Sequence, residues 1–549
     1  MEQGLIAHFP LQVDGQNLIG EIPAAHCRDI NWTAGPGGPL AKAASFNGIS
    51  STIEVNDHRN LRLGTGDFSI ALWLHTEDPG GDVVGDLISK FDPTTRRGFS
   101  LGVVTNTGVT ITTQANYRNL HFGIDNAFIE PEWIDCGRPG DAAYIASLAT
   151  CMGNLYAGTF EMQADQVGHL WQYTGDGQWQ HLGSAPEGCN CIPSVTLFDS
   201  ALYVTSGRYN PNGSRLGNAN NVRPGGKVYR IEPDGRWIDC GHPGAEGAAP
   251  DDPATAFNQG HTDFADEAMS LTVFNGELYV TTNHRYGAYK YEGQKNWKYI
   301  GPDHRVMSFT LYHGQLYALI NGGGIYRYRG ESDWEYCGNP EGCTQVYSAV
   351  TYRGDMYIGT WPKGEVYRYL GGERWQVVER VGYSLEVMAQ ILYNAKVYAG
   401  TLPMADVWRM DGDEFTYTGT VDNTPAILRR AWSMAVYQGR LYCGTLPSGR
   451  VLSLQAGCMA TYDHALKPGW CHVAAVRQGN QLKLFVDGVQ MAISAEFTAT
   501  DFDITNDHPL HIGSGVGHPL RGALCDLQIY NQALSQEQLN ALANVGQVF

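Results

Sequence analysis

Residues 345–380, QVYSAVTYRGDMYIGTWPKGEVYRYLGGERWQVVER, hold one full copy of a unit that recurs along the chain. In this copy Arg353-Gly354 form a turn, Met356-Tyr357 lie in the strand after it, residues 366–369 form the next strand, and Trp375 lies in a fourth. Gly at such a turn supplies the positive φ that a tight hairpin needs. The copy therefore predicts four short antiparallel strands joined by tight turns.

The unit is about forty residues long and recurs from roughly residue 130 to residue 455. Its clearest mark is a hydrophobic residue followed by Tyr, at Leu155-Tyr156, Leu202-Tyr203, Leu278-Tyr279, Leu316-Tyr317, Met356-Tyr357, Val397-Tyr398 and Leu441-Tyr442. The fourth-strand aromatic residues are Trp133, Trp179, Trp237, Trp297, Trp334, Trp375 and Phe415. Four short antiparallel strands repeated radially make a β-propeller. We therefore expect an all-β protein with a seven-bladed propeller over residues 129–455.

The first and last copies of the unit are incomplete in complementary ways. The element around Trp133 has the pattern of a fourth strand, but the three strands that should precede it are missing. The copy that ends near Leu454 has three strands and lacks the fourth. If residues 131–136 complete the blade formed by residues 432–455, the ring closes and no sheet edge stays exposed. The two ends of the propeller then leave it side by side, so the propeller can be an insertion in another domain. We expect residues 1–128 and 456–549 to form that domain together.

The flanking segments carry the motifs of a known module in its usual order. These are Ala44-Ser45-Phe46-Asn47-Gly48, residues 67–73, residues 469–474, and Leu484-Phe485-Val486-Asp487-Gly488. Taken together they resemble the laminin-G/concanavalin-like module. The resemblance implies a jelly-roll β-sandwich with carbohydrate or glycan-bearing partners, and in some members calcium. Structural Ca²⁺ is thus an open expectation, with Asp57, Asp92 and Asp526 as the carboxylates to inspect; the alternative is that they cap turns. Residues 535–542 are expected to form a short capped helix.

Composition limits the partners. The 549 residues carry a net charge of -19, which argues against a general nucleic-acid or membrane surface. No apolar run is long enough to span a bilayer, so no membrane insertion is expected. We expect a monomer. Glu2-Gln3-Gly4 leads directly into a strand-like segment without a signal peptide. Either the protein is intracellular, or it is secreted or periplasmic and its leader is not present in this sequence; we adopt the second interpretation.

Two insertions lengthen the repeat on one face of the propeller. They are residues 206–227, between second and third strands, and residues 241–266, between blades. Both kinds of loop lie on the same face, and long loops on a rigid scaffold usually carry function. Basic, histidine and aromatic residues, with one amide residue, gather in these loops and around the same face: Arg208, Tyr209, Asn210, Arg215, Arg223, His242, His261, His284, Arg285, Tyr286, His304, Arg305, Trp361, Lys363, Arg429 and Arg430.

Such a locally basic and aromatic face suits an acidic polysaccharide or glycan, because Arg pairs with carboxylate or sulfate and rings stack on sugars. In a uronate lyase a cation neutralises the C6 carboxylate, and Tyr or His moves the protons of the β-elimination. We assign Tyr209, Arg223, His284 and Tyr286 to catalysis. We assign substrate binding to Arg208, Arg285, Arg305, Trp361, Lys363 and Arg430. The propeller resembles the seven-bladed ulvan lyases in blade number and residue types, which implies an acidic, ulvan-like substrate in which sulfation is an option.

Other functions stay open. One is a non-catalytic glycan- or protein-binding module, since propellers and laminin-G-like sandwiches both serve as platforms. Another is a sialidase-like glycosidase, because three arginines suit a sialic-acid carboxylate, although the Ser-x-Asp-x-Gly-x-Thr-Trp turns of sialidases are missing. Cys189-x-Cys191 with His242, His261 and His284 suggests zinc by residue type, but the spacing is not that of a zinc site. We therefore expect no metal or cofactor in the chemistry, and we expect Cys136, Cys240 and Cys337 to be core residues.

Overall fold

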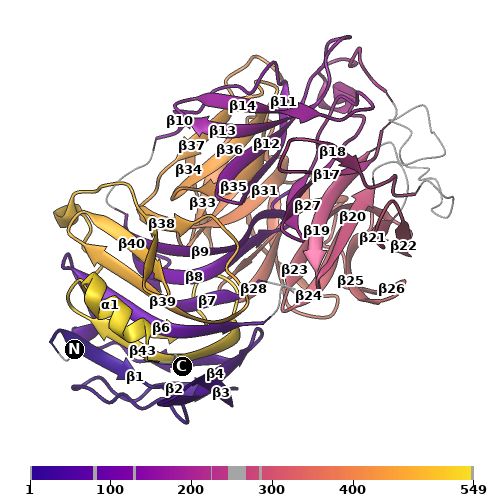
Figure 1. Cartoon of the computed structure of the whole chain (residues 1–549). Coiled ribbons are helices and arrows are strands. Elements are labelled where there is room, and N and C mark those ends of the chain that lie inside the picture. Colours follow the sequence, from indigo (N-terminus) through magenta and orange to yellow (C-terminus); the bar gives the residue numbers. More distant parts are fainter. Residues whose placement is uncertain are drawn as a thin grey trace.

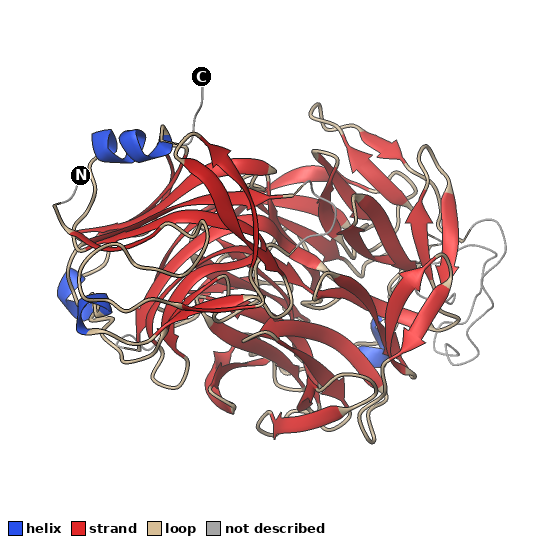
Figure 2. Cartoon of the chain, turned by 90° about the horizontal axis from the view of Figure 1, so that it is seen from below, coloured by secondary structure: helices blue, strands red, loops and turns tan. Residues whose placement is uncertain are grey.

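The computed structural model describes residues 3–77, 83–127, 132–223, 225–244, 267–282 and 287–545. Strands dominate these residues (Figure 2), as expected for an all-β protein. Within the described residues no helix has both the length and the apolar character needed to cross a bilayer. Figure 1 shows two bodies: one combines indigo and yellow strands from both ends of the chain, and the other contains the magenta to orange strands between them.

The first sheet of the terminal body mixes strands from both ends of the chain. Its order is β3-β4-β43-β6-β39-β40-β41, with β1 paired to β43. The bounds are β1 (Leu5–Phe9), β3 (Asn31–Gly37), β4 (Leu40–Asn47), β6 (Phe68–Thr76), β39 (Gly469–Gln478), β40 (Gln481–Val486), β41 (Val489–Ile493) and β43 (Arg521–Tyr530). Strand β6 pairs with β39 on one side and with β43 on the other, so its two neighbours both come from the C-terminal flank.

The second sheet of this body has the order β9-β8-β7-β42-β5-β2, with β38 paired to β9. The bounds are β2 (His26–Arg28), β5 (Thr52–Val55), β7 (Gly85–Asp92), β8 (Arg97–Thr107), β9 (Gln114–Asn126), β38 (Cys458–Tyr462) and β42 (Leu510–Ile512). Alternate side chains of the two sheets meet in one buried core that includes Leu72, Phe122, Leu484 and Ile512. Helix α1 (Gln536–Ala543) begins with the expected capping box between Ser535 and Gln538.

Four separate four-stranded sheets form blades of the inserted propeller. They are β15 (Val195–Phe198), β16 (Ala201–Thr205), β17 (Val228–Ile231), β18 (Trp237–Asp239); β19 (Ala268–Phe274), β20 (Glu277–Thr282), β21 (Ala288–Tyr291), β22 (Trp297–Gly301); β31 (Glu386–Tyr393), β32 (Lys396–Leu402), β33 (Asp406–Asp411), β34 (Glu414–Thr420); and β35 (Arg430–Tyr437), β36 (Arg440–Leu446), β37 (Val451–Leu454), β10 (Ile134–Asp135).

Twelve further strands belong to larger sheets. They are β11 (Tyr144–Cys151), β12 (Asn154–Phe160), β13 (His169–Gly175), β14 (Gln178–Ser184); β23 (Arg305–Tyr312), β24 (Gln315–Asn321), β25 (Gly324–Gly330), β26 (Asp333–Tyr336); and β27 (Gln345–Tyr352), β28 (Asp355–Trp361), β29 (Glu365–Tyr369), β30 (Trp375–Arg380). The first four join the terminal body through a Thr150–Asn116 pair, and the other eight join each other through an Asn321–Gln345 pair. The expected number of seven blades therefore stays a prediction.

The ends of the propeller segment meet as the repeat suggests. Ile134 and Asp135 of β10 pair with Ser453 and Leu452 of β37, so the first strand of the insert completes its last sheet. The fourth-strand tryptophans tie neighbouring sheets together. The indole Nε1 of Trp179 donates to the Cys136 carbonyl at 2.9 Å, and that of Trp297 donates to the Cys240 carbonyl at 2.8 Å. These rings therefore serve packing between sheets, and the side chains of Cys136 and Cys240 are buried core residues.

The hairpin between β8 and β9, residues 105–116, extends from the sandwich into the propeller; we call it the axial hairpin. Its backbone and side chains form hydrogen bonds with the first strand of each copy of the repeat. These first strands are β11, β15, β19, β23, β27, β31 and β35. Asn116 Nδ2 donates to the Val436 carbonyl at 2.7 Å, and Gln114 Nε2 donates to the Val273 carbonyl at 3.0 Å. These first strands also contact one another in sequence, and β35 contacts β11. The axial hairpin therefore fills the space that the first strands surround.

Candidate functional site

A cavity of about 540 Å³ opens beyond the tip of the axial hairpin, and we call it the axial pocket. Ile111, at the tip, lies in its floor, and the first residues of several first strands form its walls. Pockets of this size with a few convergent polar groups are the usual places for small ligands. The axial hairpin thus closes the pocket on the side of the sandwich.

The wall residues occupy equivalent positions in successive first strands. Arg305 pairs with Asn321, Gln345 with Trp361, Glu386 with Leu402, and Arg430 with Leu446; each opens its strand. Tyr144 holds the same position in β11, opposite Phe160. The repeat keeps this position while the side chain changes from copy to copy. The scaffold therefore presents a ring of different polar groups around one cavity.

A break in register two residues further along each of these strands adds a second layer. The pairing shifts between Val346 and Ser348, between Val387 and Ala389, and between Ala431 and Ser433. A β-bulge re-aims the side chain of the extra residue. The residues at these shifts, Tyr347, Met388 and Trp432, all line the axial pocket. The bulges therefore supply its aromatic and thioether surfaces.

The predicted loop 206–227 places Tyr209 in the pocket. Asn190, which is fully buried, holds the Tyr209 backbone from both sides: its Oδ1 accepts from the Tyr209 amide at 2.8 Å, and its Nδ2 donates to the Tyr209 carbonyl at 2.9 Å. The Tyr209 ring packs on Phe160 at 4.9 Å and on Tyr144 at 5.3 Å between centroids. Its hydroxyl lies 3.2 Å from the Ser214 hydroxyl. Tyr209 is therefore fixed at both its backbone and its ring.

Arginine side chains give the pocket positive charge. Arg208, Arg305 and Arg430 all line it. The Arg430 guanidinium donates to the Ser214 hydroxyl of the loop and lies 5.8 Å from the Trp432 ring centroid. Burial lowers the pKa of Arg430, but Tyr209 and Glu386 outweigh this effect and the net shift is upward. The guanidinium therefore stays charged although it is enclosed, which suits an anionic ligand.

Glu386 is a buried carboxyl group in the same pocket. It is 4% exposed, and within the described residues its Oε1 has no hydrogen-bond partner. Burial raises the pKa of the Glu386 carboxyl to about 8, and the Arg430 charge opposes part of that rise. Glu386 is therefore protonated near neutral pH and can donate a proton. Burial also raises the pKa of the Tyr144 and Tyr347 hydroxyls, so both stay protonated.

The structure brings together some of the predicted site residues and separates others. Arg208, Tyr209, Arg305, Trp361 and Arg430 all line the axial pocket. Arg223 is exposed and lies against the turn at Gly188, and Lys363 is exposed beside Gly342; neither lines the pocket. His261, His284, Arg285 and Tyr286 lie outside the described residues. Their assigned roles stay predictions.

Sequence reasoning missed Tyr144, Glu267, Tyr347 and Glu386, which also line the pocket. A signal for Tyr144 and Glu386 was present in the repeat. Tyr144, Arg305, Gln345, Glu386 and Arg430 each lie shortly before the conserved turn and strand of their own copy. A position that holds different polar residues in an otherwise constant repeat indicates a binding or catalytic site, whereas a core position would stay hydrophobic. Aligning the copies with one another would have shown it.

The carboxylates considered for calcium have protein partners. Asp57 accepts from Lys90 at 2.7 Å and from Arg62 at 3.0 Å, and Asp526 lies 2.7 Å from His8 Nε2. Asp92 accepts from the Thr94 amide at 2.9 Å, as a turn-capping residue does. The calcium expectation stays a prediction. Among the sulfurs considered for zinc, Cys189 Sγ lies 3.4 Å from Glu187 Oε1, and burial raises the pKa of its thiol.

Comparison with known proteins gives a family match to one segment of the chain and several distant structural neighbours. No curated protein sequence matches the chain. The extracellular domain of a putative hybrid two-component system from B. thetaiotaomicron has a TM-score of 0.42 at 14% identity, covering 59% of this chain and 39% of that one. The chain thus spans about two-fifths of that relative. The WD40 β-propeller domain of Doa1 has a TM-score of 0.39 at 12% identity, covering 59% of this chain and 97% of that one.

A family model matches within the C-terminal flank. It covers residues 460–540, which contain β39 to β43 and most of α1. These strands pair with β6 and β4 of the N-terminal flank in the first sheet of the sandwich. In this segment the chain is similar to the concanavalin A-like lectin/glucanases superfamily.

Proposed function

We propose that the protein is a polysaccharide lyase that cleaves a uronic-acid-containing, ulvan-like polymer by β-elimination in the axial pocket. The observation that carries this proposal is the convergence of Arg305, Arg430 and Tyr209, from three separate parts of the repeat, on one cavity. Elimination next to a uronate needs a fixed cation opposite the C6 carboxylate and positioned groups that move protons. The pocket offers both.

In this scheme each step uses a group in the pocket wall. The Arg430 and Arg305 guanidinium groups pair with the C6 carboxylate and so acidify the C5 proton. Tyr209, as the phenolate, takes that proton and becomes the phenol as the C4–O bond breaks and the C4–C5 double bond forms. Glu386, protonated near neutral pH, supplies a proton to the leaving oxygen. Trp361 and Trp432 offer ring faces for the sugars. Roles for Arg223, His284, Arg285, Tyr286 and Lys363 are not required by this scheme.

The test is the ultraviolet absorbance of the unsaturated product near about 235 nm, the band expected from the elimination chemistry. Ulvan, glycosaminoglycans and pectate serve as substrates. We expect Tyr209→Phe and Glu386→Gln to lower kcat at least about 100-fold, the usual worth of a positioned proton-transfer group. Tyr383→Phe, at a tyrosine that is 92% exposed, is the matched control and should keep full activity. No absorbance rise with any uronate polymer would rule the lyase out.

A glycosidase of the sialidase-like type is the second candidate, and one observation favours it. The pocket holds two buried carboxyl groups, Glu267 and Glu386, in addition to its three arginines. Two carboxyl groups beside a sugar-binding cleft are the usual equipment of glycoside hydrolysis, and the Tyr nucleophile that sialidases use instead has a counterpart in Tyr209. A fluorogenic sialoside separates the two functions, because hydrolysis releases the fluorophore without producing an unsaturated sugar. Binding of glycans without either product would instead identify a binding module.

Three structural assignments accompany the proposal. We assign β11–β14, β23–β26 and β27–β30 to three further blades, which gives seven, and the cyclic contacts among first strands support this number. We place the sandwich in residues 1–128 and 456–549 and the propeller in residues 129–455. Because a polymer of this kind is met outside the cytoplasm, we also propose a secreted or periplasmic location. The likeness to ulvan lyases concerns blade number and residue types.

A further inference from the structure

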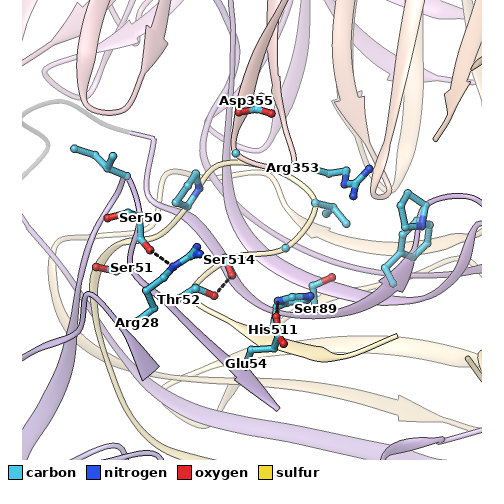
Figure 3. A pocket seen from close by; sticks show the side chains of 18 of the residues that line it. Arg28, Ser50, Ser51, Thr52, Glu54, Ser89, Arg353, Asp355, His511 and Ser514 are labelled. Atoms are coloured by element: carbon cyan, nitrogen blue, oxygen red, sulfur yellow. Dashed lines mark hydrogen bonds and ion pairs between the residues drawn. The ribbon is translucent and has the colours of Figure 1, made fainter. Parts of the chain in front are cut away.

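A second polar cavity, of about 420 Å³, lies where the sandwich meets the propeller; we call it the junction pocket. The sandwich contributes Arg28, Ser50 and Thr52, with the loop that follows β42. The propeller contributes His313 and the turn between β27 and β28. Figure 3 shows Arg28 and Thr52 on the sandwich side and Arg353 and Asp355 on the propeller side of the same space. Neither domain could form this pocket alone.

Hydrogen bonds across the junction fix its walls. The Arg353 amide donates to the Val516 carbonyl and the Gly354 amide donates to the Gly517 carbonyl, both at 3.0 Å. His313 Nε2 lies 3.1 Å from the Gly354 carbonyl. Beneath the loop, the buried Asp86 carboxyl accepts from the Gly517 amide at 2.7 Å. The turn that carries Arg353 is therefore held in place on the sandwich, and the pocket is formed in advance.

The charges of the junction pocket are unevenly paired. Asp355 lies 3.8 Å from the Arg368 guanidinium, and Glu54 lies 3.8 Å from the His511 ring, whose pKa burial lowers. Within the described residues neither Arg28 nor Arg353 has a carboxylate partner, and the Arg28 Nε donates only to the Ser50 carbonyl, at 3.3 Å. Two guanidinium groups without counter-ions at one cavity favour an anionic ligand, since Arg binds carboxylate and sulfate through paired hydrogen bonds.

Hydroxyl groups and flat surfaces complete the lining. Ser50, Thr52 and Ser514 present hydroxyls, and the Thr52 and Ser514 oxygens lie 2.5 Å apart. The rings of Phe91, His508 and Pro93 also line the cavity. Neighbouring hydroxyls match sugar hydroxyls, and flat apolar surfaces match sugar faces. We propose that the junction pocket binds a carboxylated or sulfated sugar unit of a polysaccharide, as a site separate from the axial pocket.

The two pockets lie at opposite ends of the same strand. Gln345 and Tyr347, at the start of β27, line the axial pocket, whereas Arg353, just after its end, lines the junction pocket. An eight-residue strand is roughly 25 Å long at about 3.3 Å per residue. A short oligosaccharide therefore cannot occupy both pockets at once, but a polymer can reach them both. The junction pocket would hold the polymer close to the axial pocket; this role rests on the proposed function, whereas the binding itself does not.

The test is calorimetric titration of the full chain with a sulfated uronate tetrasaccharide, with a neutral maltotetraose as the uncharged comparison. We expect two binding events per chain for the charged probe and none for the neutral one. Arg28→Gln/Arg353→Gln should remove one event or weaken it at least tenfold. Arg236→Gln/Arg374→Gln, which removes two charges elsewhere on the propeller surface, should leave both events intact. Thermal unfolding of each variant checks that the fold is kept.

The outcomes separate the two proposals. A fall from two binding events to one supports the junction pocket together with an axial site. A fall from one event to none supports the junction pocket while contradicting anion binding in the axial pocket. Binding that is equal in both double variants, or equal for the neutral probe, overturns the junction pocket. If the lyase is active, Arg28→Gln/Arg353→Gln should raise KM for the polymer at least threefold and leave kcat/KM for the tetrasaccharide unchanged.

Discussion

Glu386 shows how a single position in a repeat becomes a chemical group. Glu386 is the first residue of β31, the position that Arg305, Gln345 and Arg430 hold in their own strands. Its side chain is buried in the axial pocket, next to the space that the axial hairpin fills. A carboxyl group in such a place resists ionisation because the charged form loses its hydration. Burying this carboxyl group is energetically costly, and a hydrophobic residue would pack more easily at this position. We connect the presence of Glu386 there to its proposed role as a proton donor.

The raised pKa of Glu386 predicts a pH effect on stability. Its folded pKa, about 8, lies above the ordinary 4.5, so the folded chain holds one more proton than the unfolded chain between these values. The unfolding free energy should therefore fall by up to about 1.4 kcal/mol per pH unit through this group as pH rises from about 4.5 to about 8. Glu386→Gln removes that contribution. Urea unfolding of both proteins at several pH values measures the difference, and a constant difference would show that Glu386 ionises normally.

At the residue scale the sequence identified part of the site. Tyr209 and Arg208 could be predicted because they lie in a loop that is visibly longer than its counterparts. Arg305 and Arg430 could be predicted as basic residues on the right face. Glu386 was overlooked although it lies at the varying polar position of the repeat, which comparison of the copies reveals. Tyr347 could not be predicted, because its place at a β-bulge depends on the register of neighbouring strands.

The axial hairpin is the element that sequence reasoning did not foresee. Its residues 105–116, TNTGVTITTQAN, are mostly polar and contain a glycine turn, which is typical of an exposed loop. In the structure they are buried, and several of their hydroxyl and amide groups bond to strands far along the chain, such as Gln114 to Val273 and Asn116 to Val436. Contacts across such distances leave no local pattern. The hairpin therefore becomes recognisable only when the blades surround it.

Gly108 of the axial hairpin gives a test of that packing. Its φ is +66°, and a Cβ there would lie 2.8 Å from Thr310 Cβ and 3.2 Å from the Ala349 carbonyl oxygen. Gly276 has a similar φ of +70° with no atom within 4 Å of an added Cβ. Both Ala variants carry the strain of a positive φ, about 1 kcal/mol. Gly108→Ala should lose about 1–3 kcal/mol more through overpacking. Equal unfolding free energies for the two variants would mean that the hairpin is loosely held.

At the scale of the whole molecule, the sandwich depends on both ends of the chain. Strand β6 lies between β39 and β43, and β42 lies between β5 and β7. The two-part sandwich could be foreseen because its motifs keep their order on either side of a repeat whose ends meet. The junction pocket could not, since its walls come from segments that are more than 150 residues apart, such as Thr52 and Arg353.

This arrangement predicts the behaviour of a truncated chain. A fragment of residues 1–455 leaves β6 without partners on either side and separates β5 from β7. We expect it to be insoluble when produced alone, and to be recovered in soluble form when residues 456–549 are co-produced as a second chain. Sedimentation and amide exchange of β6 measure the outcome. If the 1–455 fragment is soluble with β6 as protected as in the full chain, the two flanks do not share a core.

The axial hairpin also bears on the order of assembly. Residues 105–116 precede every blade in the chain, so the ribosome synthesises the axial hairpin before the blades that surround it. Each new blade can then dock its first strand on a partner that already exists, and the last one is locked when β37 receives β10. In a propeller excised as a separate module, the Ser and Thr hydroxyls that line the central space would lose their hydrogen-bond partners. Transplanting the propeller would therefore require the axial hairpin as well.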